Sequence, residues 1–230
     1  MTLDLSAPHP GVIQILMNRP AQMNALDPVL LSDLVSAIGD EAASVVILGS
    51  TSRDCFSAGV DLKLGDQERA EVSRGLYRLY QLMRRTSAVL VAAAEGHVIG
   101  GGAQLLIASD LRVVGPDVSI RFMGPGHGLA VGAWRLPGLV GRGRAMDLTL
   151  SMRPVAAEEA LSIGLVEEIS AEPLVRALEI ARHIVALSPP AVAALKRIVG
   201  MTGEAEALIA EAEFNDQWNG EFPGRATNHD

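Results

Sequence analysis

The sequence is poor in cysteine and in aromatic residues. Among 230 residues there is one cysteine, Cys55, and the aromatic fraction is 3%. A single cysteine excludes an internal disulfide and is typical of a reducing compartment. No base lies near Cys55 in the sequence, which favours a small buried hydrophobe over a nucleophile. With so few aromatic side chains, the core must be built mostly from Ala, Leu, Val and Ile, and the hydrophobic fraction of 49% is that of an ordinary globular protein.

Positive charge is also scarce. Lys and Arg number 19 against 27 Asp and Glu, which gives a formal charge of −8. This balance argues against a nucleic-acid partner. The sequence has no basic-plus-apolar N-terminal signal and no apolar run of membrane length, so we expect a soluble cytoplasmic protein with no membrane partner. The length suits one large domain, or one domain with a small appendage.

The most distinctive stretch is Glu95 to Asp110, EGHVIGGGAQLLIASD. The apolar run at residues 89–94 predicts a buried strand, and residues 103–108 have helical composition. Three consecutive glycines, residues 100–102, stand between them. Because such glycines cost backbone entropy, either a ligand approaches the backbone N–H groups at the helix start, or the helix packs tightly on a strand. The run is neither a phosphate-binding P-loop nor the spaced glycine pattern of a dinucleotide site.

Strands and helices alternate through the first two-thirds of the chain, which predicts an α/β architecture. Asp27 followed by Pro28 predicts the start of a helix. Strand patterns cover residues 11–17, 44–49, 89–94, 111–114, 119–122 and 165–169. Helical patterns cover residues 28–38, 68–85, 103–108, 145–150, 156–162, 175–187, 191–199 and 204–218. We expect loops at residues 56–61 and 123–128 and a polar, frayed end at residues 219–230.

Several motifs occur in one order along the chain: Asn18-Arg-Pro with Asn24-Ala-Leu, Phe56-Ser-Ala-Gly-Val-Asp-Leu-Lys63, Glu95-Gly-His-Val-Ile-Gly-Gly-Gly102 and Asp110-Leu-Arg112. Together with Arg135-Leu-Pro137 and residues 157–166, this set resembles the crotonase superfamily, that of enoyl-CoA hydratase and isomerase. The resemblance covers nearly the whole chain. It implies an α/β fold with a crotonase-like spiral of ββα units over residues 1–172. It also implies a C-terminal helical region, residues 173–230, that assembles a homotrimer or hexamer.

The resemblance further implies an acyl-CoA thioester as the substrate, with no permanently bound cofactor or metal. By motif position, the backbone N–H groups of Val60 and Gly101 would form an oxyanion hole for the thioester carbonyl. Fixed dipoles aimed at a developing enolate are a large catalytic term that needs little reorganisation. The region that binds coenzyme A would include Met23, Ala25, Ala58 and Lys63. Lys63 would lie near the phosphates, and a solvated surface lysine is an equal alternative.

The chain departs from the family where its hydratases place two glutamates. The first position, two residues after the glycine run, holds Gln104, whose neutral amide cannot act as a general base. The second position falls near Pro125-Gly126, where no carboxylate stands. A two-glutamate hydration mechanism is therefore not expected.

Other groups could take the acid–base role. His127 lies in the loop where the family carries its second carboxylate, and its unperturbed pKa of about 6.5 suits proton transfer; the alternative is an exposed loop histidine. Glu95 and His97 flank the turn before the glycine run, and each could instead be structural. Asp61 follows the first oxyanion donor, but an aspartate there more often binds nearby backbone. Gln104 could orient a water or the thioester without transferring a proton.

Two classes of function follow from these residues. The first is an acyl-CoA enzyme that stabilises a thioester enolate, for which isomerisation, decarboxylation or thioester hydrolysis needs fewer acid–base groups than hydration. The second is a catalytically silent subunit that binds acyl-CoA or only assembles with related subunits. A titratable group beside the acyl carbons favours the enzyme, whereas a lining of only Gln104 and apolar groups favours the binder. A nucleotide-binding protein without coenzyme A is disfavoured, because phosphate-loop chemistry is absent.

Overall fold

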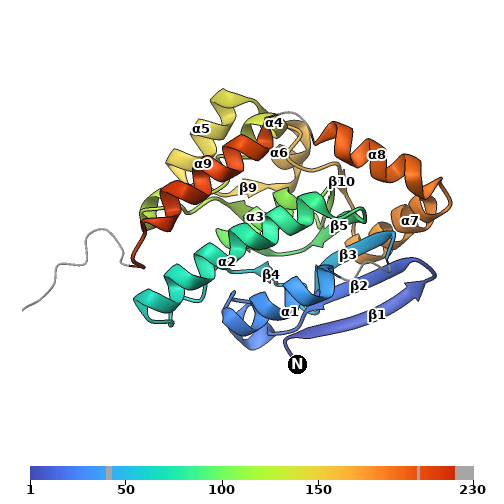
Figure 1. Cartoon of the computed structure of the whole chain (residues 1–230), viewed down its shortest axis with the longest axis horizontal. Coiled ribbons are helices and arrows are strands. Elements are labelled where there is room, and N and C mark those ends of the chain that lie inside the picture. The colour runs from blue at the N-terminus through green and yellow to red at the C-terminus, as the bar shows by residue number, and fades with distance from the viewer. Residues whose placement is uncertain (40–42, 201–202, 221–230) are drawn as a thin grey trace, which may run out of the picture.

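The computed structural model of the chain describes residues 1–39, 43–200 and 203–220. Its strands form two sheets, and its helices pack around them (Figure 1). The six-stranded sheet contains, in spatial order, β1 (Leu3–His9), β2 (Val12–Met17), β3 (Val45–Ser50), β5 (Val89–Ala94), β7 (Leu111–Val114) and β10 (Glu168–Ile169). The four-stranded sheet contains β4 (Cys55–Ser57), β6 (His97–Ile99), β8 (Ser119–Arg121) and β9 (Val155–Ala156).

The α-helices lie between the strands and at the C-terminal end of the described chain. They are α1 (Pro28–Ile38), α2 (Asp66–Arg85), α3 (Gly101–Ala108), α4 (Leu136–Val140), α5 (Arg142–Ser151), α6 (Ala157–Ser162), α7 (Pro173–Val185), α8 (Pro189–Val199) and α9 (Glu204–Asp216). Two short 3-10 turns are η1 (Pro20–Gln22) and η2 (Pro125–His127).

Successive ββα units contribute one strand to each sheet. β3 and β4 are followed by α2, and β5 and β6 are followed by α3, with the first strand of each pair in the larger sheet and the second in the smaller one. Within each sheet these strands run parallel, as β3 with β5 and β4 with β6. This repetition is the expected spiral, and it brings the loop after β4 beside the start of α3.

The central parallel strands of the larger sheet, β3 and β5, are buried on both faces. One face belongs to the main core, and its central side chains are Val46, Leu48, Leu90 and Ala92. The alternate side chains face α7 with its buried Ala177 and Ala181; they include Val45, Ile47, Val89 and Val91. The near-continuous apolar runs of β3 and β5 therefore serve two cores at once.

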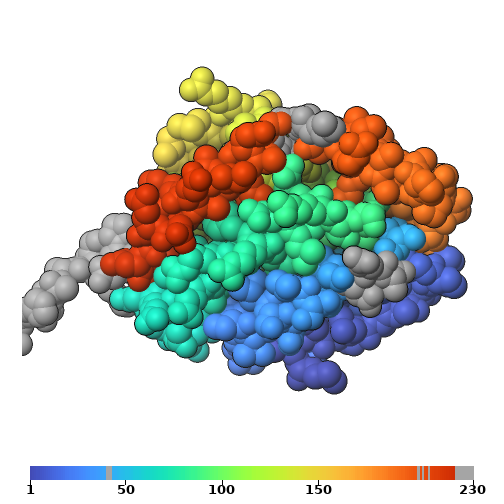
Figure 2. Space-filling model, in the orientation of Figure 1, coloured from blue at the N-terminus to red at the C-terminus, as the bar shows by residue number. Residues whose placement is uncertain are grey.

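The C-terminal helices pack on the body of the same chain. A Cβ built on Gly49 of β3 would lie 2.8 Å from Leu174 Cδ2, so α7 lies very close to the sheet. On α8, Lys196 Nζ pairs with Asp110 Oδ2 at 2.7 Å and donates to the Ala88 carbonyl at 2.7 Å. α9 lies along α2, as Figure 2 shows for the red and teal segments. The division at residue 172 and the assembly role stay predictions.

Some element boundaries differ from those expected. α1 begins at Pro28 as predicted, because Asp27 Oδ1 accepts from Leu30 N at 2.8 Å. Residues 55–57, expected in part as a loop, form β4, and α3 and α5 begin two and three residues earlier than expected, at Gly101 and Arg142. Three-residue strands are too short to show alternation, which explains the first miss. The polar end expected at residues 219–230 falls, from residue 221 on, outside the described residues.

Candidate active site

A cavity of about 310 Å³ lies between α2, the loop after β4, the start of α3 and the end of α9. Five of the residues that the sequence predicts for the site line it, namely Ala58, Val60, Gly101, Gln104 and His127. Most other wall side chains are apolar, including Leu62, Leu76, Ile99, Met123, Leu129 and Val131. Arg69 and Arg121 also line it, but no carboxylate from the described residues does. The cavity thus matches an apolar ligand with few polar contacts.

The three consecutive glycines are needed for different physical reasons. Gly100 has φ +54°, and a Cβ built there would meet nothing within 4 Å, so its backbone conformation is the constraint. A Cβ on Gly101 would lie 2.9 Å from Leu26 Cδ1. A Cβ on Gly102 would lie 2.6 Å from the Ser57 carbonyl oxygen. Tight packing of α3 therefore accounts for the second and third glycines.

Gly59 brings the two predicted oxyanion donors together. It has φ +85°, and a Cβ built there would lie 2.8 Å from the Ile99 carbonyl oxygen and 3.3 Å from Gly101 N. The chain that leads into Val60 thus packs directly on the start of α3. Within the described residues, the backbone N–H groups of Val60 and Gly101 donate no hydrogen bond. Because Gly101 is also the first residue of α3, its N–H lies at the positive end of the helix dipole.

Met23 and Ala25 do not line the cavity. The Met23 carbonyl accepts a hydrogen bond from Ala58 N at 2.9 Å. Between them, the buried Asn24 amide donates to the Phe56 carbonyl at 3.1 Å. These bonds fix the segment that carries Val60, so this motif supports the site.

Lys63 and Glu95 do not line the cavity. Lys63 is exposed, and its backbone N–H donates to Asp61 Oδ1 at 2.9 Å, so Asp61 binds nearby backbone. Glu95 Oε1 lies 3.5 Å from Arg53 Nε. Burial raises the pKa of Glu95, and Arg53 opposes that rise. The Glu95 carboxylate thus pairs with Arg53 and does not line the cavity, and its acid–base role stays a prediction.

Cys55 and His97 have structural surroundings. The Cys55 thiol donates to the carbonyl oxygens of Met23 at 3.2 Å and His97 at 3.3 Å. Burial raises the pKa of Cys55 to about 11, so the thiol stays protonated at neutral pH. The His97 side chain is exposed and does not line the cavity. The expectation of a small buried Cys55 is confirmed.

His127 lines the cavity from the turn η2 and is half buried. Burial lowers the pKa of His127, and the neighbouring Arg69 cation lowers it further. Its imidazole is therefore neutral at pH 7 and can accept a proton. Among the described residues that line the cavity, it is the one with an ordinary pKa near neutrality.

Gln104 belongs to a closed ring of buried hydrogen bonds. Its Oε1 accepts from Trp134 Nε1 at 3.0 Å and from Gly132 N at 3.2 Å, and its Nε2 donates to the Tyr77 hydroxyl at 3.4 Å. Tyr77 in turn donates to Glu211 Oε1 at 2.7 Å. Glu211 Oε2 closes the ring by accepting from Trp134 N at 2.8 Å. Both ends of the Gln104 amide are thus engaged by protein groups.

Glu211 was not identified by the sequence reasoning. It lies on α9 with 4% exposure, and burial raises its pKa to about 7, against the hydrogen bonds from Tyr77, Trp134 and Gly132. A signal was present: Leu208, Glu211 and Asn215 recur at a spacing that places them on one helix face, and all three are buried. The sequence around α9 does not by itself show that this polar face is buried.

The described residues offer neither a cluster of metal-binding side chains nor a single membrane-spanning helix. In residues 1–39, 43–200 and 203–220, no group of three or more His, Cys, Asp or Glu side chains could hold a metal ion. In the same ranges no single helix is long and apolar enough to cross a membrane. The neighbouring α7 and α8 would meet that test only as a pair, and they are bent by 113° at their junction.

Known proteins resemble this chain in sequence and in fold over nearly its whole length. The family model described as enoyl-CoA hydratase/isomerase matches residues 8–228. The probable enoyl-CoA hydratase echA6 of Mycobacterium tuberculosis is 37% identical over 216 residues, which cover 90% of this chain and 86% of that protein. The crystal structure of an enoyl-CoA hydratase from Bacillus anthracis has a TM-score of 0.81 at 28% identity, covering 94% of this chain and 89% of the other.

A second solved structure, an enoyl-CoA hydratase/isomerase from Xanthobacter autotrophicus, has a TM-score of 0.84 at 26% identity and covers 96% of this chain and 89% of its own. The sequence match and the structural matches thus extend over the same, nearly complete length. The chain belongs to the enoyl-CoA hydratase/isomerase family, within the crotonase superfamily.

Proposed function

We propose that the chain is an acyl-CoA enzyme that holds a thioester carbonyl between the backbone N–H groups of Val60 and Gly101. The observation that carries the proposal is the pairing of these two donors on an apolar cavity, with no protein acceptor for either among the described residues. Such donors stabilise the enolate oxygen that forms when a proton leaves the acyl α-carbon. Gly59 has no side chain to cover Gly101 N, which keeps this position open to the ligand.

The proton-transfer group in this proposal is His127. Hydration needs one group to activate water and a second to deliver a proton, whereas the described residues that line the cavity include one histidine and no carboxylate. Double-bond isomerisation needs only one: His127 takes the proton from the α-carbon, the enolate forms in the hole, and the same imidazolium returns the proton to the γ-carbon. A neutral imidazole, which the lowered pKa of His127 favours, is the form required to start this sequence.

One observation favours the second candidate, a silent acyl-CoA-binding or assembly subunit. The Gln104 Oε1 accepts from Trp134 and Gly132 and its Nε2 donates to Tyr77, so this neutral amide is held by the protein and cannot take a proton from a water or a thioester. If His127 also fails to reach the acyl carbons, only apolar groups remain beside them. The site would then bind acyl-CoA without turning it over.

Turnover and binding assays together separate the two candidates. The protein is mixed with crotonyl-CoA and with 2- and 3-enoyl-CoAs, and the absorbance of the conjugated thioester is followed. We expect this absorbance to appear from 3-enoyl substrates and not to decay through hydration. His127→Ala should abolish the signal and keep acyl-CoA binding by calorimetry, while His97→Ala, a histidine outside the cavity, should behave as wild type. Binding without turnover by the wild type would favour the silent subunit, and absence of binding would refute both.

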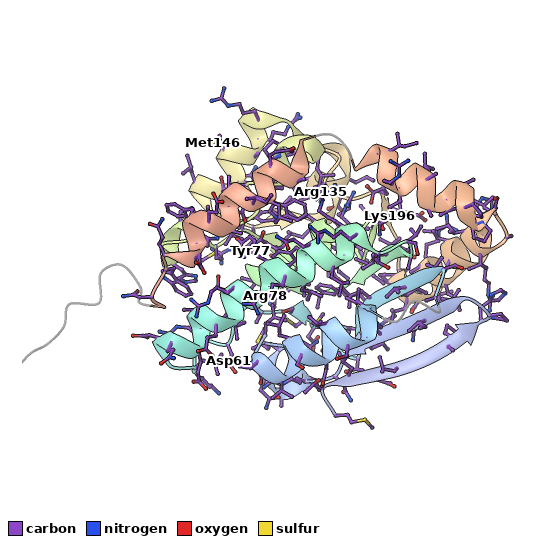
Figure 3. All side chains as sticks on the ribbon, in the orientation of Figure 1. Asp61, Tyr77, Arg78, Arg135, Met146 and Lys196 are labelled. Carbon is purple, nitrogen blue, oxygen red and sulfur yellow. The ribbon has the colours of Figure 1, made fainter. Side chains whose placement is uncertain are left out.

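We also propose the other properties that the family resemblance implies. They comprise a homotrimer or hexamer, cytoplasmic localisation, no permanently bound cofactor, and coenzyme A contacts from Ala58, Lys63, Met23 and Ala25. Apolar side chains exposed on α5 and α8 support assembly, since Met146, Leu150 and Leu195 are 52%, 61% and 62% exposed. Met146 lies on the outer side of α5 (Figure 3). Light scattering of the purified protein tests the oligomer directly.

A further inference from the structure

A second hollow lies on the far side of the cavity wall. Its volume is about 250 Å³, and it opens between α2 and α9. It shares three lining residues with the candidate active site, namely Ser73, Tyr77 and Asn215. These side chains therefore form a partition, one side chain thick, between the apolar cavity and a groove whose other walls include Arg74 and Arg78.

The partition is held from both helices. Tyr77 projects from α2 on the side of α9 (Figure 3), and its hydroxyl accepts from Asn215 Nδ2 at 2.6 Å. Asn215 Nδ2 also donates to the Ala130 carbonyl at 2.9 Å, and Asn215 Oδ1 accepts from Ala130 N at 2.9 Å. Glu211 anchors the Tyr77 hydroxyl from behind at 2.7 Å. Because both side chains are at most 5% exposed, the wall is an ordered part of the core.

The polar atoms of Tyr77 and Asn215 are used within the partition. The single Tyr77 hydroxyl hydrogen is directed to Glu211 Oε1, and both Asn215 amide hydrogens have acceptors. No buried side-chain nitrogen or oxygen of the described residues lacks a hydrogen-bond partner. A ligand that reaches Tyr77 and Asn215 thus meets no spare donor on either side chain.

We propose that Tyr77 and Asn215 set the length of the acyl group, so that the site takes acyl-CoA thioesters with a short acyl chain. This inference rests on the proposed acyl-CoA function. The chain would extend from the thioester at Val60 and Gly101 and stop at the Tyr77–Asn215 partition. Removal of the partition would join the two hollows and let a longer chain pass between α2 and α9.

The test is a chain-length series of saturated acyl-CoAs, from butyryl to dodecanoyl, measured by calorimetry on the full-length protein. For the wild type, affinity should rise with each methylene and stop rising once the chain reaches the partition. For Tyr77→Ala, the affinity should keep rising for the longer acyl-CoAs, by about fourfold for each added methylene that becomes buried. Asn215→Ala thins the same wall from α9 and should give the same extension, so the result does not depend on one variant folding.

Two matched variants control the interpretation. Tyr77→Phe keeps the ring and removes only the hydroxyl, and should retain the wild-type length limit if the wall acts sterically. Arg78→Ala alters only the outer groove and should also retain the wild-type length limit. If the wild type binds short acyl-CoAs and Tyr77→Ala and Asn215→Ala leave the length profile unchanged, the partition inference is overturned while the proposed function stands. If no member of the series binds the wild type, both the proposed function and the inference that rests on it are refuted.

Discussion

Gln104 and Glu211 accept hydrogen bonds from the same backbone N–H, that of Gly132. The distances from Gly132 N are 3.2 Å to Gln104 Oε1 and 3.3 Å to Glu211 Oε1. A neutral amide from α3 and an ionisable carboxyl from α9 therefore sit side by side in the core. A carboxylate at position 104 would place two acids at one donor, where one of them must stay protonated.

Gln104→Glu should therefore destabilise the fold at alkaline pH instead of restoring a hydratase. We expect a loss of about 1–3 kcal/mol in the free energy of unfolding at pH 8, and a smaller loss at pH 6, where one proton can be shared. Urea unfolding at the two pH values measures this difference. The exchanged double variant, Gln104→Glu with Glu211→Gln, keeps one acid in the pair and should recover most of the loss. A single variant as stable as wild type at pH 8 would refute the coupling.

Glu211 should make stability depend on pH near neutrality. Its folded pKa of about 7 lies above the unfolded value, so the native state holds more protons between those two values. The stabilisation is complete below the unfolded pKa of about 4.3 and is lost as pH rises through about 7. Glu211→Gln mimics the protonated form and should remove this dependence, whereas Glu213→Gln, on the exposed face of α9, should keep it. The free energy of unfolding is measured from pH 5 to pH 8 for each variant. If it changes with pH equally in the wild type and in Glu211→Gln, Glu211 is not the group responsible.

Gly59→Ala and Gly100→Ala form a matched pair of substitutions at left-handed backbone positions. Both should cost stability through strain, by about 1–2 kcal/mol. Only at Gly59 would the new Cβ crowd Gly101 N, at 3.3 Å, because nothing lies within 4 Å of a Cβ on Gly100. Gly59→Ala should therefore weaken acyl-CoA binding at least about tenfold more than Gly100→Ala. Equal losses in calorimetric titrations would mean that Gly101 N does not contact the ligand.

The rate of isomerisation should fall only in acid solution below pH 6.5. Burial and the Arg69 cation both lower the pKa of His127, so the neutral base persists below the ordinary titration range of a histidine. The pH profile of kcat/KM reports this group in the free enzyme. An acidic inflection above pH 6.5, or a profile that His127→Asn leaves unaltered, would assign the base elsewhere.

Local patterns were enough to predict the units that frame the site. The apolar run of β5, the glycine run and α3 follow from periodicity, and the Asp27 cap fixes α1. The short strands β4 and β6 have too few residues for a pattern, although they pair with each other in the second sheet. Glu211 and Tyr77 are 134 residues apart, and their contact depends on how α9 docks on α2. No composition or spacing signal encodes that docking.

The cavity draws on residues 58 to 218, so its walls emerge from the ribosome at very different times. The donors Val60 and Gly101 precede Asn215 and Trp218 by more than a hundred positions. Because a domain generally folds as a unit, a nascent chain without residues 215 and 218 lacks two of the side chains that line the cavity. The complete cavity requires that synthesis has passed residue 218. Bound ligand then favours the docked form of α9, which makes substrate a late stabiliser of the newly made protein.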